Sequence, residues 1–204
     1  MCGINGLYSY KKVTEDNIKV IHEMNKEMIY RGPDEQDVWY DRKVALGHVR
    51  LSIIALDNGR QPILNEDKSL ILICNGEIYN HKSLRKDLET QGHTFSTNSD
   101  CEVLLHLYEE YGTEFFNLLN GMYAFAIYDI KNQKVILGRD RQGKKPLYYT
   151  NTPNGFVFSS ELKTIKEKWL DEITINHNVI NQTIERTFSL SKTDTYIKGI
   201  HKVQ

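Results

Sequence analysis

A cysteine stands second in the sequence, directly after the initiator methionine and ahead of a glycine and an isoleucine. Once Met1 is removed, Cys2 carries a thiol and a free α-amine on adjacent carbon atoms. The amine has a reference pKa of about 8 and the thiol one of about 8.5, so a proton passes between them at little cost. An N-terminal nucleophile therefore brings its own general base and needs no histidine partner.

An amide side chain and a free backbone N–H follow an apolar run later in the chain. The run LILIC precedes Asn75 and Gly76, which we place where a strand passes into a polar turn. Two such donors converging on one point form an oxyanion hole, which typically stabilises a transition state by several kcal/mol. An ordinary Asn-Gly turn is the alternative. The apolar run before the pair and Glu77 behind it disfavour that alternative.

Three charged side chains are suited to holding an amino acid. Arg50 presents a planar fork that can bind a carboxylate through two hydrogen bonds. Glu77 and Asp100 are acceptors for an ammonium group. Each has a structural alternative: Arg50 can be a surface residue of a strand, and Asp100 follows the predicted N-cap Ser99, where the helix dipole alone favours an acidic residue.

Several spaced segments carry a resemblance to a known family. With Cys2-Gly3-Ile4, the segments RGPD, RLSI, CNGEIYNH and SDCE resemble those of class II glutamine amidotransferases, most closely the glutaminase domain of asparagine synthetases. RGPD and NGEIYN together are typical of the asparagine branch. The resemblance covers nearly the whole chain to about residue 165, on segments 2–4, 31–34, 50–53, 74–81, 99–102, 121–129, 138–149 and 158–163.

The resemblance implies an N-terminal-nucleophile hydrolase, which is an α+β fold: a four-layer αββα sandwich with two largely antiparallel sheets. It implies hydrolysis of L-glutamine to glutamate and ammonia through a thioester on Cys2, with Asn75 and Gly76 holding the oxyanion. The residues assigned to glutamine binding are Arg50, Leu51, Ser52, Ile53, Ile54, Glu77 and Asp100, with Arg31 placed near the pocket.

The expected partner is a second, ATP-dependent unit. In asparagine synthetases the ammonia passes to a domain that activates aspartate with ATP and magnesium. These 204 residues contain no SGGxDS-type pyrophosphate loop, so we expect no cofactor in this chain and assign ATP and magnesium to a synthetase domain or subunit. Two alternatives stay open: a non-catalytic glutamine-sensing or scaffolding module, and delivery of ammonia to an acceptor other than aspartate.

One stretch imitates a nucleotide site. GRDRQGKK (138–145) has the glycine and lysine spacing of a phosphate-binding loop. However, Lys145 stands where magnesium binding needs Ser or Thr, and Pro146 leads into a predicted strand rather than a helix. We therefore predict no nucleotide binding there.

Composition narrows the other function classes. The net charge is −1 and the basic residues are scattered, which disfavours nucleic acid or a membrane surface as partner. No apolar run is long enough to span a membrane and no leader precedes Cys2, so we expect a cytoplasmic protein. Three cysteines without CxxC spacing and seven histidines without HExxH or HxxxH spacing predict neither disulfides nor metal ligands. A homodimer is left open.

Hydrophobic patterns predict the elements that position these residues. Thr14 is the predicted N-cap of a helix that stops at Gly32-Pro33, and Ser99 with Glu102 has capping-box spacing ahead of a helix stopped by Gly112. We expect one domain over 1–204, of which 170–204 is a C-terminal extension. The predicted elements are strands over 3–9, 36–41, 43–54 and 69–76, helices over 14–34, 81–93 and 103–111, and hairpins over 121–140 and 146–160.

Overall fold

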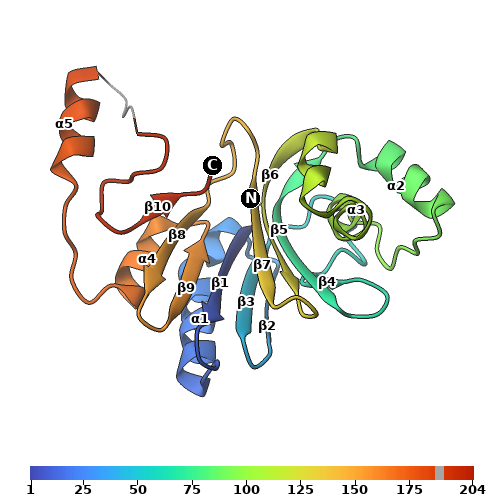
Figure 1. Ribbon diagram of the computed structural model, residues 1–204, viewed down its shortest axis with the longest axis horizontal. Coiled ribbons are helices and arrows are strands. Elements are labelled where there is room, and N and C mark those ends of the chain that lie inside the picture. The colour runs from blue at the N-terminus through green and yellow to red at the C-terminus, as the bar shows by residue number, and fades with distance from the viewer. Residues whose placement is uncertain (187–190) are drawn as a thin grey trace.

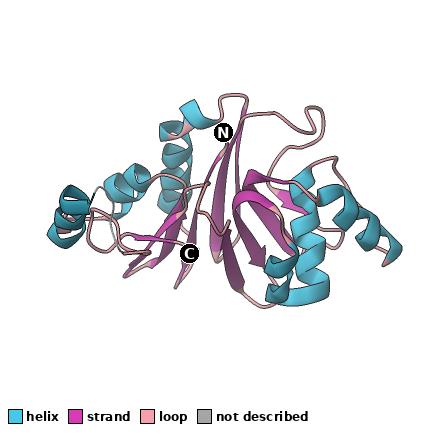
Figure 2. Ribbon diagram, turned by 90° about the horizontal axis from the view of Figure 1, so that it is seen from above, coloured by secondary structure: helices cyan, strands magenta, loops and turns pink. Residues whose placement is uncertain are grey.

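In the computed structural model, which describes residues 1–186 and 191–204, two β-sheets lie face to face and helices cover their outer faces (Figures 1 and 2). The larger sheet has six strands, ordered β10-β8-β9-β1-β3-β2, and the smaller has four, ordered β4-β5-β6-β7. Every pairing between neighbouring strands is antiparallel. The αββα sandwich with two antiparallel sheets is the architecture that the sequence predicts.

The larger sheet contains the N-terminal strand at its centre, and α1 and α4 pack on its outer face (Figure 1). Thr14 caps α1 in a capping box with Asn17, which confirms the predicted helix start. The elements of this half are β1 Gly3–Ser9, α1 Glu15–Glu27, η1 Ile29–Arg31, β2 Glu35–Tyr40, β3 Val44–Arg50, β8 Tyr148–Thr152, β9 Gly155–Ser159, α4 Leu162–Trp169 and β10 His201–Lys202.

The smaller sheet is covered by α2 and α3, and the strands obey a period of two. Along β6, Tyr123, Phe125 and Ile127 pack with the helices, whereas Ala124 and Ala126 pack between the sheets. Burial on both faces explains the nearly continuous apolar sequence of this strand and of β5. The elements are β4 Ile63–Leu64, β5 Leu70–Ile78, α2 His81–Thr90, η2 Asp100–Glu102, α3 Val103–Tyr111, η3 Gly112–Leu118, β6 Gly121–Asp129 and β7 Lys134–Arg139.

Strand β5 corrects the expected turn at Asn75 and Gly76. The strand runs on to Ile78, and Asn75 and Gly76 lie opposite Ala124 and Tyr123 of β6. Pairing along the whole of β6 supplies backbone partners that outweigh the turn preference of an Asn-Gly pair. Glycine is needed here for close approach, because a Cβ on Gly76 would lie 2.5 Å from the carbonyl oxygen of Met122.

Three further local expectations are wrong in detail. The first helix ends at Glu27, and η1 fills the gap to Gly32-Pro33. The strand predicted over 43–54 ends at Arg50, so Leu51–Ile54 form a loop. Glu102 makes no capping box with Ser99, because its carboxylate accepts the backbone N–H groups of Ser96 and Thr97, each at 2.7 Å.

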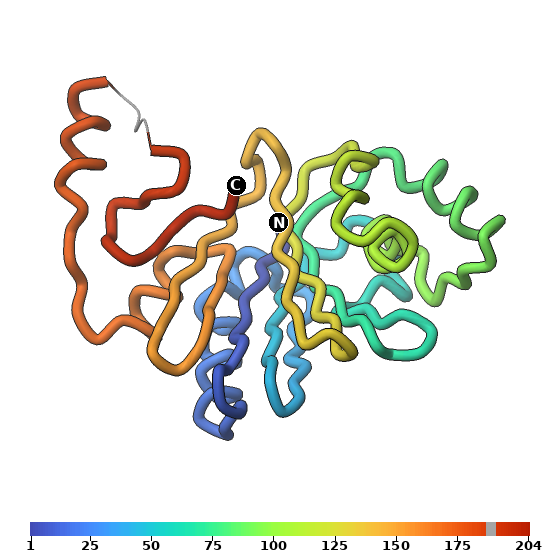
Figure 3. The backbone as a smooth tube through the Cα atoms, viewed as in Figure 1, coloured from blue at the N-terminus to red at the C-terminus, as the bar shows by residue number. Residues whose placement is uncertain are grey.

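The C-terminal segment leaves the sandwich and returns to it. After α4 the chain runs out to α5 (His177–Arg186), which stands apart from both sheets, and then comes back beside β8 (Figure 3). There β10 pairs with β8, and His201 lies opposite Tyr149. Residues 187–190 of the expected 170–204 extension lie outside the described residues. None of the helices in the described part has the length and apolarity to cross a membrane.

Candidate active site

The nucleophile predicted from the sequence lies at the tip of β1, between the two sheets. Strand β1 starts at Gly3, so Cys2 lies just before the start of the strand, and it is half-buried. Its Sγ accepts the backbone N–H of Leu51 at 3.4 Å. Burial raises the pKa of the Cys2 thiol, and this effect outweighs the hydrogen bond from Leu51, which lowers it. The thiol is therefore protonated near neutral pH and needs a base before it can attack.

A pocket opens beside this thiol and gathers most of the predicted site residues. Of that set, only Ser52 and Arg31 do not line it. The predicted residues that do are Cys2, Arg50, Leu51, Ile53, Ile54, Asn75, Gly76, Glu77 and Asp100. Residues far apart in sequence thus converge on one cavity, as a site for a small polar molecule requires.

The amide of Asn75 is buried in this pocket with a free donor. Its Nδ2 has no hydrogen-bond partner among the described residues, although the residue is only 1% exposed. Leaving a buried amide donor unpaired costs about 1–3 kcal/mol, so natural proteins rarely do so without a reason. A donor kept free beside a nucleophile is available for charge that develops on a substrate.

Two residues that the sequence analysis did not single out hold the strand just before Asn75. The Gln61 side chain donates from Nε2 to the Cys74 carbonyl (3.1 Å) and accepts the Cys74 N–H at Oε1 (2.6 Å). His48, on β3 of the other sheet, places its Nε2 3.2 Å from the same carbonyl oxygen. Burial lowers the pKa of His48 to about 4, so the ring is neutral and its Nε2–H donates. No local pattern in the sequence marks either residue.

Arg50 is a buried anchor, which rules out the surface alternative. Nη1 donates to the carboxylate of Glu35 at 2.9 Å, and Nη2 donates to the carbonyls of Ile54 and Ala55 at 3.1 and 2.7 Å. Ala55 has φ of 52°, a left-handed conformation that is costly for a residue with a Cβ. The loop is thus bent around the guanidinium, whose Nε keeps no partner among the described residues and remains available.

Two carboxylates lie at the same pocket. Asp100 accepts the backbone N–H of Ile78 at 2.7 Å, while Ser99 alone caps η2. Asp100 also stands in the first turn of η2, as the structural alternative expects, so its helix position and its place at the pocket coexist. Burial raises the pKa of Asp100, and the nearby carboxylate of Glu77 adds to the rise. A bound ammonium group would relieve both effects, because it would place positive charge between two crowded acceptors.

Two further motif segments, RGPD and FSSELK, hold the backbone of Cys2 from outside the pocket. Arg31 of RGPD donates from Nε to the Cys2 carbonyl at 3.0 Å and pairs through Nη1 with Glu161 of FSSELK. Asp34 accepts the Ser52 N–H at 2.7 Å, which explains why Ser52 does not face the pocket. RGPD therefore positions both the nucleophile and the loop opposite it, and does not touch the cavity.

Two antiparallel sheets between helices, with a cysteine at the tip of a central strand and a free donor beside it, define an N-terminal-nucleophile hydrolase. The chain belongs to the glutamine amidotransferase domain family, which it matches over residues 1–204, and it is therefore an enzyme domain of that class.

The relatives narrow the class further. Asparagine synthetase [glutamine-hydrolyzing] 2 of Bacillus subtilis is 44% identical over 167 residues, 81% of this chain and 22% of that protein. Asparagine synthetase [glutamine-hydrolyzing] 3 of the same organism is 37% identical over 209 residues, 99% of this chain and 33% of that protein. This chain thus spans a third or less of the length of both relatives.

The solved structures agree on the fold. The glutamine phosphoribosylpyrophosphate amidotransferase of B. subtilis superposes with a TM-score of 0.66 at 24% identity, covering 81% of this chain and 43% of that one. A structure titled as the allosteric regulatory enzyme of purine biosynthesis gives 0.67 at 26% identity, with the same coverage. The sandwich expected from the sequence is therefore shared with solved amidotransferases.

Proposed function

We propose that this chain hydrolyses L-glutamine to glutamate and ammonia, with Cys2 as nucleophile once Met1 has been removed. The observation that carries the proposal is the free, buried amide donor of Asn75 in the same pocket as the Cys2 thiol. A donor without a ground-state partner is suited to charge that appears only in the transition state.

The reaction follows from the groups at the pocket. The α-amine of Cys2 takes the thiol proton, and the thiolate attacks the side-chain carbonyl carbon of glutamine. The oxyanion that forms is held by the Asn75 amide and the Gly76 N–H. The protonated amine then gives its proton to the departing ammonia, which leaves a γ-glutamyl thioester. Water attacks the thioester, releasing glutamate and restoring the thiol.

The opposite end of the substrate is held by charge. Arg50 has Nε available for the α-carboxylate, and Glu77 with Asp100 accepts the α-ammonium. Arg31 and Gln61 do not touch the substrate in this proposal. They hold the backbones of Cys2 and Cys74, and so fix the nucleophile and the oxyanion donors relative to each other.

Removal of Met1 is part of the proposal for a spatial reason as well as a chemical one. Met1 lines the same pocket as Cys2 and is 54% exposed, so an aminopeptidase can reach it. Cleavage would convert the Cys2 amide nitrogen into a basic amine and would clear space beside the thiol.

We further propose that the ammonia serves asparagine synthesis from aspartate, in a cytoplasmic enzyme whose synthetase domain or subunit binds ATP and magnesium. The support is that two Bacillus relatives are named as glutamine-hydrolysing asparagine synthetases and are about three or more times longer than the matched region.

The test is glutamine-dependent ammonia release by the purified chain, with the N-terminus defined by intact mass. We expect release from the Met1-free form and none from a form that keeps an uncleavable N-terminal extension. After an acid quench, a glutamyl adduct should appear on the wild-type chain. A Met1-free chain that binds glutamine without turnover would instead support the sensing alternative, and turnover by the extended form would exclude the α-amine as base.

Aspartate as acceptor needs a separate test. The chain is mixed with a synthetase domain of the asparagine synthetase type, ATP, magnesium and aspartate, and asparagine is measured with glutamine or with ammonia as nitrogen source. Asparagine formed from glutamine only when both proteins are present supports the proposal. Ammonia release without any transfer to aspartate would point to another acceptor.

A further inference from the structure

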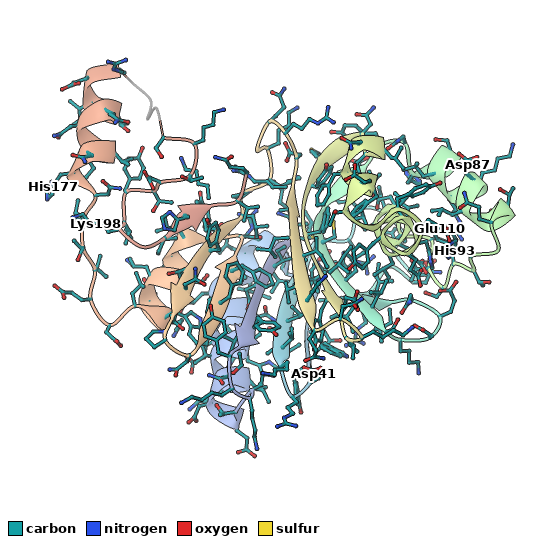
Figure 4. All side chains as sticks on the ribbon, in the orientation of Figure 1. Asp41, Asp87, His93, Glu110, His177 and Lys198 are labelled. Atoms are coloured by element: carbon teal, nitrogen blue, oxygen red, sulfur yellow. The ribbon has the colours of Figure 1, made fainter. Side chains whose placement is uncertain are left out.

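A cluster of histidines and glutamates lies on the outer side of the smaller sheet. Glu66, His93, His106 and Glu109 each offer one ligand atom, and these four atoms all lie within 4.8 Å of one another. None of them lines the active-site pocket. Figure 4 shows His93 close to Glu110 at the edge formed by α3 and the loop that follows α2.

The four residues come from three segments. Glu66 lies between β4 and β5, His93 follows α2, and His106 and Glu109 stand three residues apart on α3. A spacing of three places the last two on one face of the helix. The absence of local histidine motifs underlay the expectation of no metal ligands, but local spacing cannot detect ligands contributed by three separate segments.

Each of the two imidazoles points its Nδ1 atom at the same two carboxylates, those of Glu66 and Glu109. Nδ1 of His106 lies 2.9 Å from Oε2 of Glu109 and 3.7 Å from Oε2 of Glu66. Nδ1 of His93 lies 3.6 Å from Oε2 of Glu109 and 4.0 Å from Oε1 of Glu66. A single N–H can serve only one acceptor well, whereas a cation at the centre would satisfy all four groups.

A fifth residue, Glu110, contacts His93 from outside the cluster. Nε2 of His93 lies 2.9 Å from Oε1 of Glu110, a carboxylate that can accept an Nε2–H. In the tautomer protonated only on Nε2, Nδ1 turns a lone pair toward the oxygens of Glu66 and Glu109, and a cation between them would remove that repulsion. Metal-binding histidines almost always donate the remote ring N–H to a carboxylate, a backbone carbonyl or water, and Glu110 is such a carboxylate.

The carboxylate ligands are also held from outside the cluster. The Asn65 amide donates to Oε1 of Glu109 at 2.7 Å, and the Thr94 N–H donates to Oε1 of Glu66 at 2.9 Å. His106 is fully buried, and its Nε2 has no partner in the described part of the chain. Its Nδ1, which faces the cluster, is therefore the nitrogen through which it can bind.

We propose that Glu66, His93, His106 and Glu109 form a binding site for a divalent d-block cation, with Zn²⁺ the best match. Two imidazole nitrogens and two carboxylate oxygens are a suitable tetrahedral ligand set for Zn²⁺. Two carboxylates and two neutral imidazoles also balance its charge. The ion would tie the β4–β5 loop and the α2–α3 loop to α3, and so its role is structural.

The experiment measures metal binding in the full 204-residue chain carrying Cys2→Ala, which removes the half-buried thiol as a competing ligand. Zn²⁺ content after equilibrium dialysis, the visible absorption of bound Co²⁺ and the melting temperature with and without Zn²⁺ are recorded. We expect about one ion per chain, a tetrahedral Co²⁺ spectrum, and a melting temperature that rises with Zn²⁺.

Two surface variants keep the test independent of folding. Glu66→Gln removes a ligand and should weaken Zn²⁺ binding at least about 100-fold, and Glu110→Gln removes the carboxylate behind His93 and should weaken it roughly 10–100-fold. His22→Gln, an exposed histidine on α1, is the matched control and should change nothing. Unsaturable Zn²⁺ uptake by the parent chain, or equal affinity in Glu66→Gln and His22→Gln, would show that the cluster is only an ion-pair network.

Discussion

The active-site pocket and the histidine–glutamate cluster differ in the kind of polar group that is present in excess. In the pocket a donor is left over, since the buried Asn75 amide has no partner. In the cluster the carboxylates of Glu66 and Glu109 crowd the Nδ1 atoms of His93 and His106, and Glu110 occupies the remote nitrogen of His93. An excess of donors prepares a site for negative charge, and an excess of acceptors prepares one for a cation.

The two regions also differ in how they are positioned. The pocket residues Cys2, Asn75 and Gly76 stand on or beside central strands, whose register both neighbours fix. The cluster residues stand on loops and on α3, where His106 is buried and Glu109 is exposed. Catalysis tolerates little displacement, whereas a metal ion can itself draw loop ligands into place. The placement of each site therefore fits the accuracy that its chemistry demands.

The largest expected effect is a loss of glutamine turnover that a change in the pocket causes and a change in the cluster does not. Cys2→Ala should lower glutamine turnover by roughly 10³-fold or more, because the atom that forms the thioester is gone. Turnover is measured as ammonia release, and circular dichroism checks that the fold is kept. Glu66→Gln, which alters only the cluster, should retain wild-type turnover. Equal losses in both variants would mean that the two regions are not independent.

Asn75 tests whether the free donor acts on the transition state. Asn75→Ala should lower kcat by roughly 10²–10³-fold with little change in KM, because the oxyanion exists only after attack. Steady-state kinetics with glutamine give both constants. A raised KM at unchanged kcat would instead assign Asn75 to ground-state binding.

His48 tests the support behind the pocket through pH. Burial lowers the pKa of His48 from 6.5 to about 4 in the folded chain. As pH falls from about 6.5 to about 4, the unfolded chain takes up this proton and the folded chain does not, so stability falls by about 3 kcal/mol. Urea unfolding at several pH values should show this loss in the wild type and a smaller one in His48→Gln. If the free energy of unfolding falls equally with pH in both proteins, a group other than His48 causes the loss.

Arg50 should give the smallest of these effects. Arg50→Lys keeps the charge but loses the Nε–H that is assigned to the α-carboxylate, and it should raise KM for glutamine by roughly 10-fold while kcat falls less. Glu35→Gln, which leaves the guanidinium in place, is the matched control and should change KM less. A drop in kcat at constant KM for Arg50→Lys would overturn its assignment to the α-carboxylate.

The sequence predicted the architecture well where the signal was local. Thr14 caps its helix, Gly112 ends α3 with φ of 53°, and both predicted hairpins occur. The apolar run over 70–74 predicted a strand, and β5 lies there in the interior. These features depend on neighbours a few residues away, so a single sequence carries enough information to predict them.

Expectations were wrong where a hydrogen-bond partner outside the motif competed with the one that the motif implies. The Asn75-Gly76 pair has the composition of a turn, but pairing with β6 keeps it in a strand. Glu102 has capping-box spacing from Ser99, but the loop N–H groups of Ser96 and Thr97 take its carboxylate. In both cases the competing partner offers more hydrogen bonds than the expected one, and the motif alone does not show that choice.

The sequence by itself determined the chemistry available to this protein: a thiol behind the initiator methionine, an amide and glycine after an apolar run, and an arginine with two carboxylates for an amino acid. Only the tertiary structure decided which groups are free and which are occupied. It showed that Gln61 and His48 hold the Cys74 backbone and that Asn75 keeps an unpaired donor. It also brought together two histidines and two glutamates from three segments, namely Glu66, His93, His106 and Glu109. The physical reason is that hydrogen-bond satisfaction and charge balance are properties of the packed chain, set by contacts between residues far apart in sequence.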